Sequence, residues 1–300
     1  MANFSIREIL GSTTPIITVV DIGAMMEGKI KNRYDGLVER GMAQVIGFEP
    51  EPGEFQKLNA RTDQRHAYLP YFVGNGRPGI FHRCRYNGCS SLYKPNVQLI
   101  DLFTSIGASR NGNFEVLGTT EVTTKRLDDI EEITACDFLK IDVQGAELDV
   151  LEGAVRTLAR TAVVELEVEF VPLYEGQPLF AELDGFMRRN GFLLHRLVDV
   201  GGRPLRPFSS VGNCYRPISQ ILWADAVYIK DFTCLEKLPA DMLLKTAVVL
   251  HEAYASIDMV ALVLKAYDAK AGTALCDAYM ARIASAPNLE YSFLNVKDWI

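Results

Sequence analysis

Short apolar runs alternate with segments of helical periodicity along residues 16–230. Several of the apolar runs are continuous and rich in Val and Ile, which is typical of strands buried on both faces of a parallel sheet. The pattern predicts strands over residues 16–22, 44–49, 71–73, 137–142, 162–168, 192–197 and 224–229. It predicts helices between them, over residues 30–40, 53–60, 145–158 and 178–189.

This alternation predicts an α/β fold with a mostly parallel sheet and helices on both of its faces. The last two strands are joined by residues rich in Gly, Pro and Arg, without a helical pattern. Such a segment is too irregular for a crossover helix, so we expect the seventh strand to be antiparallel. A seven-stranded Rossmann-like sheet with a reversed last strand resembles the class I methyltransferases that use S-adenosylmethionine.

Two segments lie outside the alternation and define the predicted domains. Residues 77–136 contain Gly, Asn, Ser and short β-like runs, and we interpret them as an insertion over the ligand-binding edge. Residues 233–300 are predicted as a helical C-terminal extension, following a methyltransferase domain over residues 1–232. Its amphipathic face predicts either packing on the sheet domain or a homodimer contact.

Composition and charge narrow the class of protein. The chain has 300 residues, 48% of them hydrophobic, and a net charge of 31 − 38 = −7, which argues against a general nucleic-acid binder. No apolar run is long enough for a membrane helix, and the first residues do not resemble a signal peptide. Six scattered cysteines without CxxC pairs predict reduced thiols, and the four histidines form no metal-binding motif. We therefore expect a cytoplasmic protein without a metal site.

Acidic residues end the first two predicted strands. Asp21 is followed by Ile22, Gly23 and Ala24, and Glu49 comes directly before Pro50. A carboxylate repels a pyrophosphate but favours a cationic ligand, and the second acid suits the two hydroxyls of a ribose. No P-loop or GxGxxG motif is present, which disfavours nucleoside triphosphates and a dehydrogenase. After the third strand, Asn75 either contacts an adenine or belongs to a plain turn.

The segment 137–154 carries the candidate catalytic residues. Lys140 interrupts a predicted buried strand, so it requires an acidic partner or a lowered pKa. Asp142 leaves the end of that strand, and Glu147 lies early in the next helix. Together with Glu165, these residues predict either an ionic cluster beside a reacting group or a structural salt-bridge network.

The same segment closely resembles the FkbM-type methyltransferase family, whose hallmark string is KID-x-(E/Q)-G-A-E-x-x-x-L-x-G-A. The resemblance extends to residues 124–130, 165–168 and 173–180, and covers roughly residues 16–230. It implies S-adenosylmethionine as the methyl donor and, usually, O-methylation of a hydroxyl on a sugar, polyketide or other small metabolite. It also implies that Asp21, Gly23 and Glu49 bind the cofactor, and that Asp142 and Glu147 line the reaction centre.

One loop departs from the family pattern. The family has D-(I/V)-G-A-N-x-G, whereas this chain has Met25 in place of Asn and a glycine delayed to Gly28. The loop therefore takes a different path near the methionine part of the cofactor. A Ser-Ser-Leu element of the family is matched by residues 90–92, where Ser91 either contacts the methionine carboxylate or caps a turn. The cofactor-binding residues predicted in all are Asp21, Gly23, Ala24, Glu49, Pro50, Asn75 and Ser91.

Methyl transfer to an alcohol needs an in-line approach and gains from a general base. We expect Asp142 or Glu147 to be that base, with Lys140 holding its partner in place. A divalent metal bound by Asp142, Glu165 and Glu167 is a second hypothesis. Three arginines in the last connection, Arg203, Arg206 and Arg216, predict either a lid for an anionic acceptor or a solvated loop. The alternative to an enzyme is an inactive cofactor-binding or interaction protein, which the altered loop would favour.

Overall fold

The computed structural model describes residues 4–25, 32–60 and 64–285, which divide into two compact units. The sheet unit consists of Ile17–Asn32 and Ala43–Thr233. The helical unit consists of Met1–Ile16, Arg33–Met42 and Cys234–Ile300. The helical unit therefore takes its residues from both ends of the chain and from a short segment between the first two strands.

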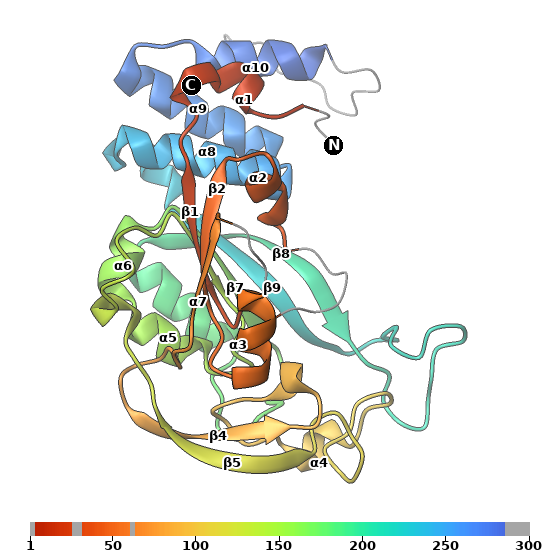
Figure 1. Cartoon of the computed structure of the whole chain (residues 1–300). Coiled ribbons are helices and arrows are strands. Elements are labelled where there is room, and N and C mark those ends of the chain that lie inside the picture. The colour runs from red at the N-terminus through yellow and green to blue at the C-terminus, as the bar shows by residue number, and fades with distance from the viewer. Residues whose placement is uncertain (1–3, 26–31, 61–63, 286–300) are drawn as a thin grey trace. The chain divides into compact units, whose positions relative to one another are not determined.

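A seven-stranded sheet forms the centre of the sheet unit, in the order β3-β2-β1-β6-β7-β9-β8 (Figure 1). All neighbours pair in parallel except β9, which runs antiparallel to both β7 and β8. The predicted fold class and the reversed last strand are thus confirmed. The strands are β1 (Ile17–Ile22), β2 (Ala43–Phe48), β3 (His66–Leu69), β6 (Phe138–Ile141), β7 (Val163–Glu169), β8 (Phe192–Gly202) and β9 (Ile221–Lys230).

The third strand lies earlier in the chain than predicted. It is His66–Leu69, whereas residues 71–73 contribute only an isolated bridge from Val73 to Lys125. Pro70 follows the strand directly and has no backbone N–H, so it cannot continue the ladder. β3 is also an edge strand of the sheet, which explains why its residues are mixed in polarity rather than uniformly apolar.

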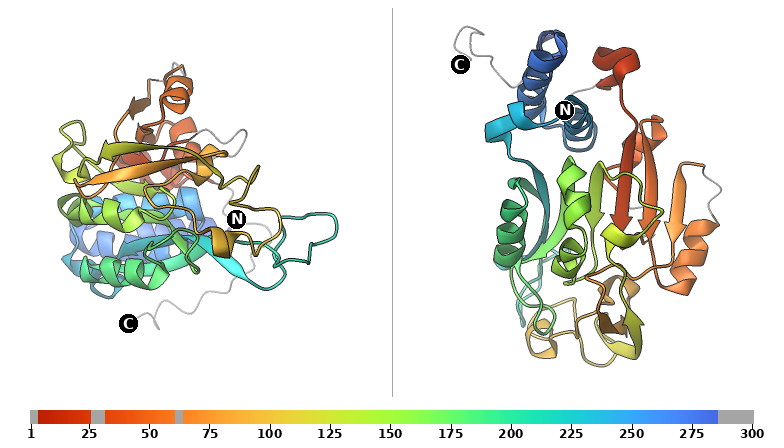
Figure 2. Two further views of the ribbon diagram at one scale, coloured as in Figure 1. Left: turned by 90° about the horizontal axis from the view of Figure 1, so that it is seen from below. Right: turned by 90° about the vertical axis from the view of Figure 1, so that its left-hand side faces the viewer.

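Three helices cover one face of the sheet (Figure 2): α5 (Glu147–Glu152), α6 (Val155–Arg160) and α7 (Phe180–Arg189). The single helix predicted over residues 145–158 is therefore two. The break is at Gly153, where a Cβ atom would collide with the backbone oxygen of Gly74. The loop that contains Gly74 approaches so closely that position 153 requires glycine, and the helix is interrupted there.

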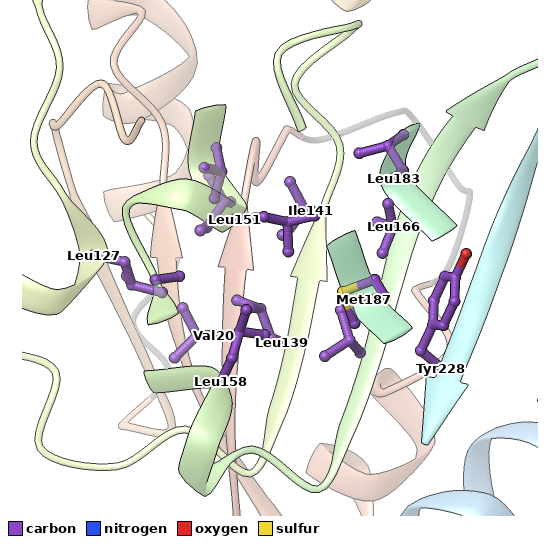
Figure 3. Packing of buried hydrophobic residues seen from close by; sticks show 14 of the residues in the cluster. Val20, Leu127, Leu139, Ile141, Leu151, Leu158, Leu166, Leu183, Met187 and Tyr228 are labelled. Carbon is purple, nitrogen blue, oxygen red and sulfur yellow. The ribbon is translucent and has the colours of Figure 1, made fainter. Parts of the chain in front are cut away.

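Side chains from these helices and from alternate strand positions form the main core (Figure 3). Val20, Leu139 and Leu166 point from three strands toward Leu151 and Met187 of the helices. All five side chains are fully buried. This packing fixes the strands whose carboxyl ends carry the candidate site.

The insertion folds as a small two-stranded antiparallel sheet near the carboxyl ends of the parallel strands (Figure 1). A hydrogen bond from Ser91 in the insertion to the backbone of Gln144 links it to the loop after β6. The insertion thus lies at the carboxyl-terminal edge of the parallel strands. Its elements are β4 (Pro78–Cys84), η2 (Asn87–Cys89), α4 (Val97–Ile100), β5 (Val116–Thr123) and η3 (Leu127–Asp129). Earlier in the chain, β2 is followed by α3 (Pro52–Asn59), whose N-terminus is capped by the Glu51 side chain.

The helical unit packs short and long helices around a buried histidine. His251 in α8 lies 2.9 Å from the Tyr279 hydroxyl and 2.8 Å from the backbone oxygen of Phe4. These contacts join both ends of the described chain within this unit. None of its described helices is long and apolar enough to cross a membrane. Its elements are α1 (Arg7–Leu10), η1 (Gly11–Thr13), α2 (Asp35–Glu39), α8 (Ala240–Tyr254), α9 (Ile257–Ala271) and α10 (Leu275–Ala284). The short helix η4 (Phe232–Lys237) begins in the sheet unit and ends in the helical unit.

Candidate active site

Three acidic side chains lie at the carboxyl ends of adjacent parallel strands. Asp21 is the last residue but one of β1, Glu49 follows β2, and Asp142 follows β6. Because the sheet order places β1 between β2 and β6, the three residues share one edge. In open α/β sheets this edge is where ligands bind.

Lys140 connects two of these acids. Its Nζ atom lies 3.5 Å from Oδ1 of Asp21 and 3.7 Å from Oδ2 of Asp142. It is also opposite Glu165 in the register of β6 and β7. Burial opposes the ammonium charge, but the surrounding carboxylates outweigh burial and raise the pKa of Lys140 above its usual range. The lysine thus remains a cation, with Asp21 as a partner that the predicted cluster did not include.

Glu49 is a buried carboxyl group at the end of β2, only 7% exposed. Its Oε1 accepts a hydrogen bond of 2.7 Å from the backbone of Glu51, on the far side of Pro50. Burial raises the pKa of Glu49 to about 7, and the charges of Glu51, Glu54 and Asp21 add to the effect. A group that is costly to ionise without a partner gains from hydroxyl donors, which a ribose would supply.

Gly23 is required by the packing of the protein itself. Its φ is +88°, and a Cβ atom there would collide with the backbone oxygen of Asp142. The backbone nitrogens of Gly23 and Ala24 both donate to the carbonyl of Phe48, at 3.1 and 3.0 Å. The turn after β1 is therefore held between the ends of β2 and β6. The loop departs from the family pattern at Met25, which is described, and at Gly28, which lies outside the described residues.

The two candidate bases differ in exposure. The Asp142 side chain is 39% exposed, whereas Glu147 is 1% exposed. Glu147 accepts hydrogen bonds at Oε1 from the backbone nitrogens of Val143 and Gly145, at 2.9 and 3.2 Å. Burial raises its pKa to about 7. Glu147 therefore holds the loop after β6 in place, and Asp142 is the more exposed carboxylate of the two.

Asn75 and Ser91 are bonded within the protein. Asn75 donates to Oδ1 of Asp149 at 2.8 Å and accepts from the backbone of Arg77 at 3.1 Å. Ser91 donates to the backbone oxygen of Gln144 at 2.6 Å and accepts from the backbone of Tyr93 at 2.9 Å. Contacts of these residues with adenine and with the methionine carboxylate stay predictions.

Two comparisons of the sequence decide the family. Residues 28–194 match the family described as Methyltransferase FkbM domain. The 2-O-methyltransferase NoeI of Sinorhizobium fredii (strain NBRC 101917 / NGR234) is 32% identical over 192 residues, which cover 60% of this chain and 74% of NoeI. This chain belongs to the FkbM methyltransferase family.

Solved structures show a weaker likeness. One described as LepI in complex with SAM has 12% identity and a TM-score of 0.33, covering 76% of this chain and 47% of that one. One described as a pericyclic reaction enzyme has 11% identity and a TM-score of 0.32. The chain spans about half the length of these structures. Family membership therefore follows from the sequence matches.

S-adenosylmethionine is the methyl donor of the FkbM family. The chemistry of the predicted residues fits this molecule. Glu49 offers buried carboxylate oxygens, which suit ribose hydroxyls. Asp21 places a carboxylate, paired with Lys140, at the next strand end, and its charge suits a cationic ligand. The positive-φ turn at Gly23 brings backbone, rather than side chains, to the edge between them.

In the described part of the chain, the carboxylates of β7 and of the loop after β6 do not form a metal site. No group of three or more His, Cys, Asp or Glu residues there is placed to hold a metal ion. The hypothesis of a metal between Asp142, Glu165 and Glu167 is therefore not supported by the geometry.

Two of the three arginines in the connection before β9 are used by the protein itself. Arg203 donates to the backbone oxygen of Gly202 at 2.7 Å and lies over the rings of Tyr215 and Trp223. Arg206 donates to the backbone oxygen of Phe103 at 2.8 Å. These two guanidinium groups therefore serve to attach the connection, and they give no support to an anionic acceptor.

The sequence argument missed Gln144, Tyr174 and Glu169 near Asp142, and it named Glu167 only as a candidate metal ligand. Gln144 donates to Asp142 and to Glu167, and its side-chain oxygen lies 3.0 Å from the Tyr174 hydroxyl. Burial and neighbouring carboxylates raise the pKa of Glu167 and of Glu169 well above the usual range. The available signal was the alternation of Glu165, Glu167 and Glu169 along one face of a predicted buried strand.

Proposed function

We propose that this protein transfers a methyl group from S-adenosylmethionine to a hydroxyl of a small metabolite or sugar. The observation that carries the proposal is the placement of Asp21, Glu49 and Asp142 at three adjacent strand ends. Two of these acids suit the cofactor, and the third is open to solvent beside them. The 2-O-methyltransferase activity in the name of NoeI supports a hydroxyl acceptor.

In this reaction Asp142 would receive the proton of the acceptor hydroxyl, whose oxygen takes the methyl group. When bound, S-adenosylmethionine would supply that methyl group from its sulfonium sulfur and leave as S-adenosylhomocysteine. Lys140 holds Oδ2 of Asp142 at 3.7 Å and thereby orients the carboxylate. Glu147 keeps the loop in place through its two backbone hydrogen bonds.

Calorimetry with S-adenosylhomocysteine tests the cofactor half of the proposal. We expect Glu49→Gln to weaken binding by about tenfold, because an amide replaces a charged acceptor of the ribose hydroxyls. Glu121→Gln, at an exposed position of β5, is the matched control and keeps the affinity of the natural chain. Unchanged affinity in Glu49→Gln would place the ribose elsewhere.

A panel of hydroxylated acceptors tests the transfer itself. Methyl glycosides and phenols are incubated with radiolabelled S-adenosylmethionine, and Asp142→Asn is expected to lower kcat by roughly 100-fold or more on any accepted compound. Cofactor binding without transfer to any member of the panel would contradict the proposed activity.

A further inference from the structure

Gln144 occupies the centre of a hydrogen-bond network beside the proposed base. Its Nε2 atom donates to Oδ1 of Asp142 at 2.9 Å and to Oε2 of Glu167 at 2.6 Å. Both hydrogens of the amide nitrogen are therefore used. Its Oε1 atom lies 3.0 Å from the hydroxyl of Tyr174, whose one hydrogen is also within reach of the backbone oxygen of Cys89 at 3.1 Å. With carboxylates facing the nitrogen and a hydroxyl facing the oxygen, the partners determine the orientation of the amide.

The backbone of Gln144 is held in an uncommon conformation. Its φ is +58°, in the left-handed region that residues with side chains rarely adopt. The hydroxyl of Ser91 donates to its carbonyl at 2.6 Å, and Glu147 accepts from Val143 and Gly145 on either side. Such a conformation persists where the surroundings impose it, and it is concentrated at functional sites. Here it directs the amide between two carboxylates.

We propose that Gln144 is a positioning residue that fixes the carboxylate of Asp142 for the acceptor and separates it from Glu167. The inference rests on the proposed function, in which Asp142 takes the proton. Gln144 holds Oδ1 of Asp142 while Lys140 lies nearest Oδ2, so the two oxygens have different partners. Rotation of the carboxylate is thereby restricted before an acceptor arrives, which is the arrangement that general-base catalysis requires.

The charges around Glu167 make this role measurable. The carboxyl groups of Asp142, Glu169, Glu147 and Asp225 all act on Glu167, and their repulsion adds to its burial. The amide of Gln144 is the donor that counteracts these effects at Oε2. Removal of the donor therefore disfavours the ionised form of Glu167, and an added carboxylate disfavours it further.

The first test needs no acceptor. Gln144→Leu and Gln144→Glu are compared with Gln98→Leu, a control at an exposed position of α4. Carbon-13 NMR of the side-chain carboxyl groups follows the titration of Glu167. We expect its midpoint to rise by about one pH unit or more in both variants, with the affinity for S-adenosylhomocysteine within about twofold of the natural chain. An unchanged midpoint would overturn the proposal.

The second test uses an acceptor found in the panel. We expect Gln144→Leu to lower kcat by roughly 10- to 100-fold without raising KM for S-adenosylmethionine. The loss in Gln144→Glu should be smaller at pH 6 than at pH 8, because a protonated carboxyl donates one hydrogen bond again. Equal losses at both pH values would indicate a loop-folding role and contradict the inference. If the natural chain binds S-adenosylhomocysteine but methylates nothing, the proposed function fails while the NMR titration still decides the role of Gln144.

Discussion

Toward the carboxyl ends of its strands, the central sheet has two faces that differ in kind, although the same strands build both. On one face, Leu139 of β6 and Leu166 of β7 pack against α5, α6 and α7. On the other face, the next residues along the same strands are Lys140, Glu165 and Glu167. Alternation of side chains along a strand thus places an apolar layer and an ionisable layer a single residue apart.

The comparison shows how the protein separates stability from chemistry. A fully buried leucine contributes about 1.5–3 kcal/mol to folding, whereas buried carboxyl groups oppose it unless they are paired. The raised pKa values of Glu167, Glu169 and Asp225 show that ionising these buried groups opposes folding. Burial of side chains on the apolar face offsets this loss of stability. Removing an apolar side chain should therefore lower stability, whereas neutralising a buried carboxyl group with a raised pKa should not.

The largest effect is expected on the apolar face. Leu166→Ala removes a side chain that is 0% exposed in a strand bonded on both sides. The lost burial and the cavity should lower the free energy of unfolding by about 4 kcal/mol in urea denaturation. The neighbouring Glu167→Gln is the matched control from the opposite face and should not destabilise the protein. A loss below 1 kcal/mol for Leu166→Ala would contradict the division between the faces.

Lys140→Met tests the cation of the ionisable face. It removes a charged partner of Asp21, which is 1% exposed, and should cost about 3 kcal/mol of stability. Adding Asp21→Asn to Lys140→Met should recover part of the loss, because the buried negative charge is removed as well. Independent, additive losses in this double-mutant cycle would show that the two residues are not coupled.

Glu49→Gln should stabilise the protein in a pH-dependent way. The folded pKa of Glu49 is about 7, above its ordinary value of 4.5, so the folded state holds the proton more tightly and loses stability as pH rises between those values. The amide removes this effect. Thermal denaturation should show almost no gain at pH 4.5 and about 2 kcal/mol at pH 8. A gain that is the same at both pH values would contradict the burial of an ionising group.

Most of the fold could be predicted because its signals are local. The continuous apolar runs predicted the central strands, and the irregular connection before β9 predicted the reversed strand. The errors arose from tertiary packing. The run at residues 71–73 looks more strand-like than His66–Leu69, but Pro70 and the position at the sheet edge decide the pairing. The break at Gly153 depends on the distant loop at Gly74, which no local pattern reveals.

The candidate site could be predicted in its positions but not in its contacts. Acids at strand ends identified Asp21, Glu49 and Asp142, because parallel strands bring their carboxyl ends to one edge. The sequence did not distinguish Asp142 from Glu147, since that difference depends on which carboxylate the loop buries. Gln144 was missed because its contacts reach Glu167 in another strand.

The reversed strand β9 also has a consequence for biosynthesis. β8 is made before β9 but bonds only to β9, which in turn lies against β7. While a ribosome has delivered the chain only as far as Gly202, β8 has no strand to join and the outer side of β7 remains an open template for pairing. The sheet is completed only after Lys230 emerges, so a stalled nascent chain would expose the strand that carries Glu165, Glu167 and Glu169 to aggregation.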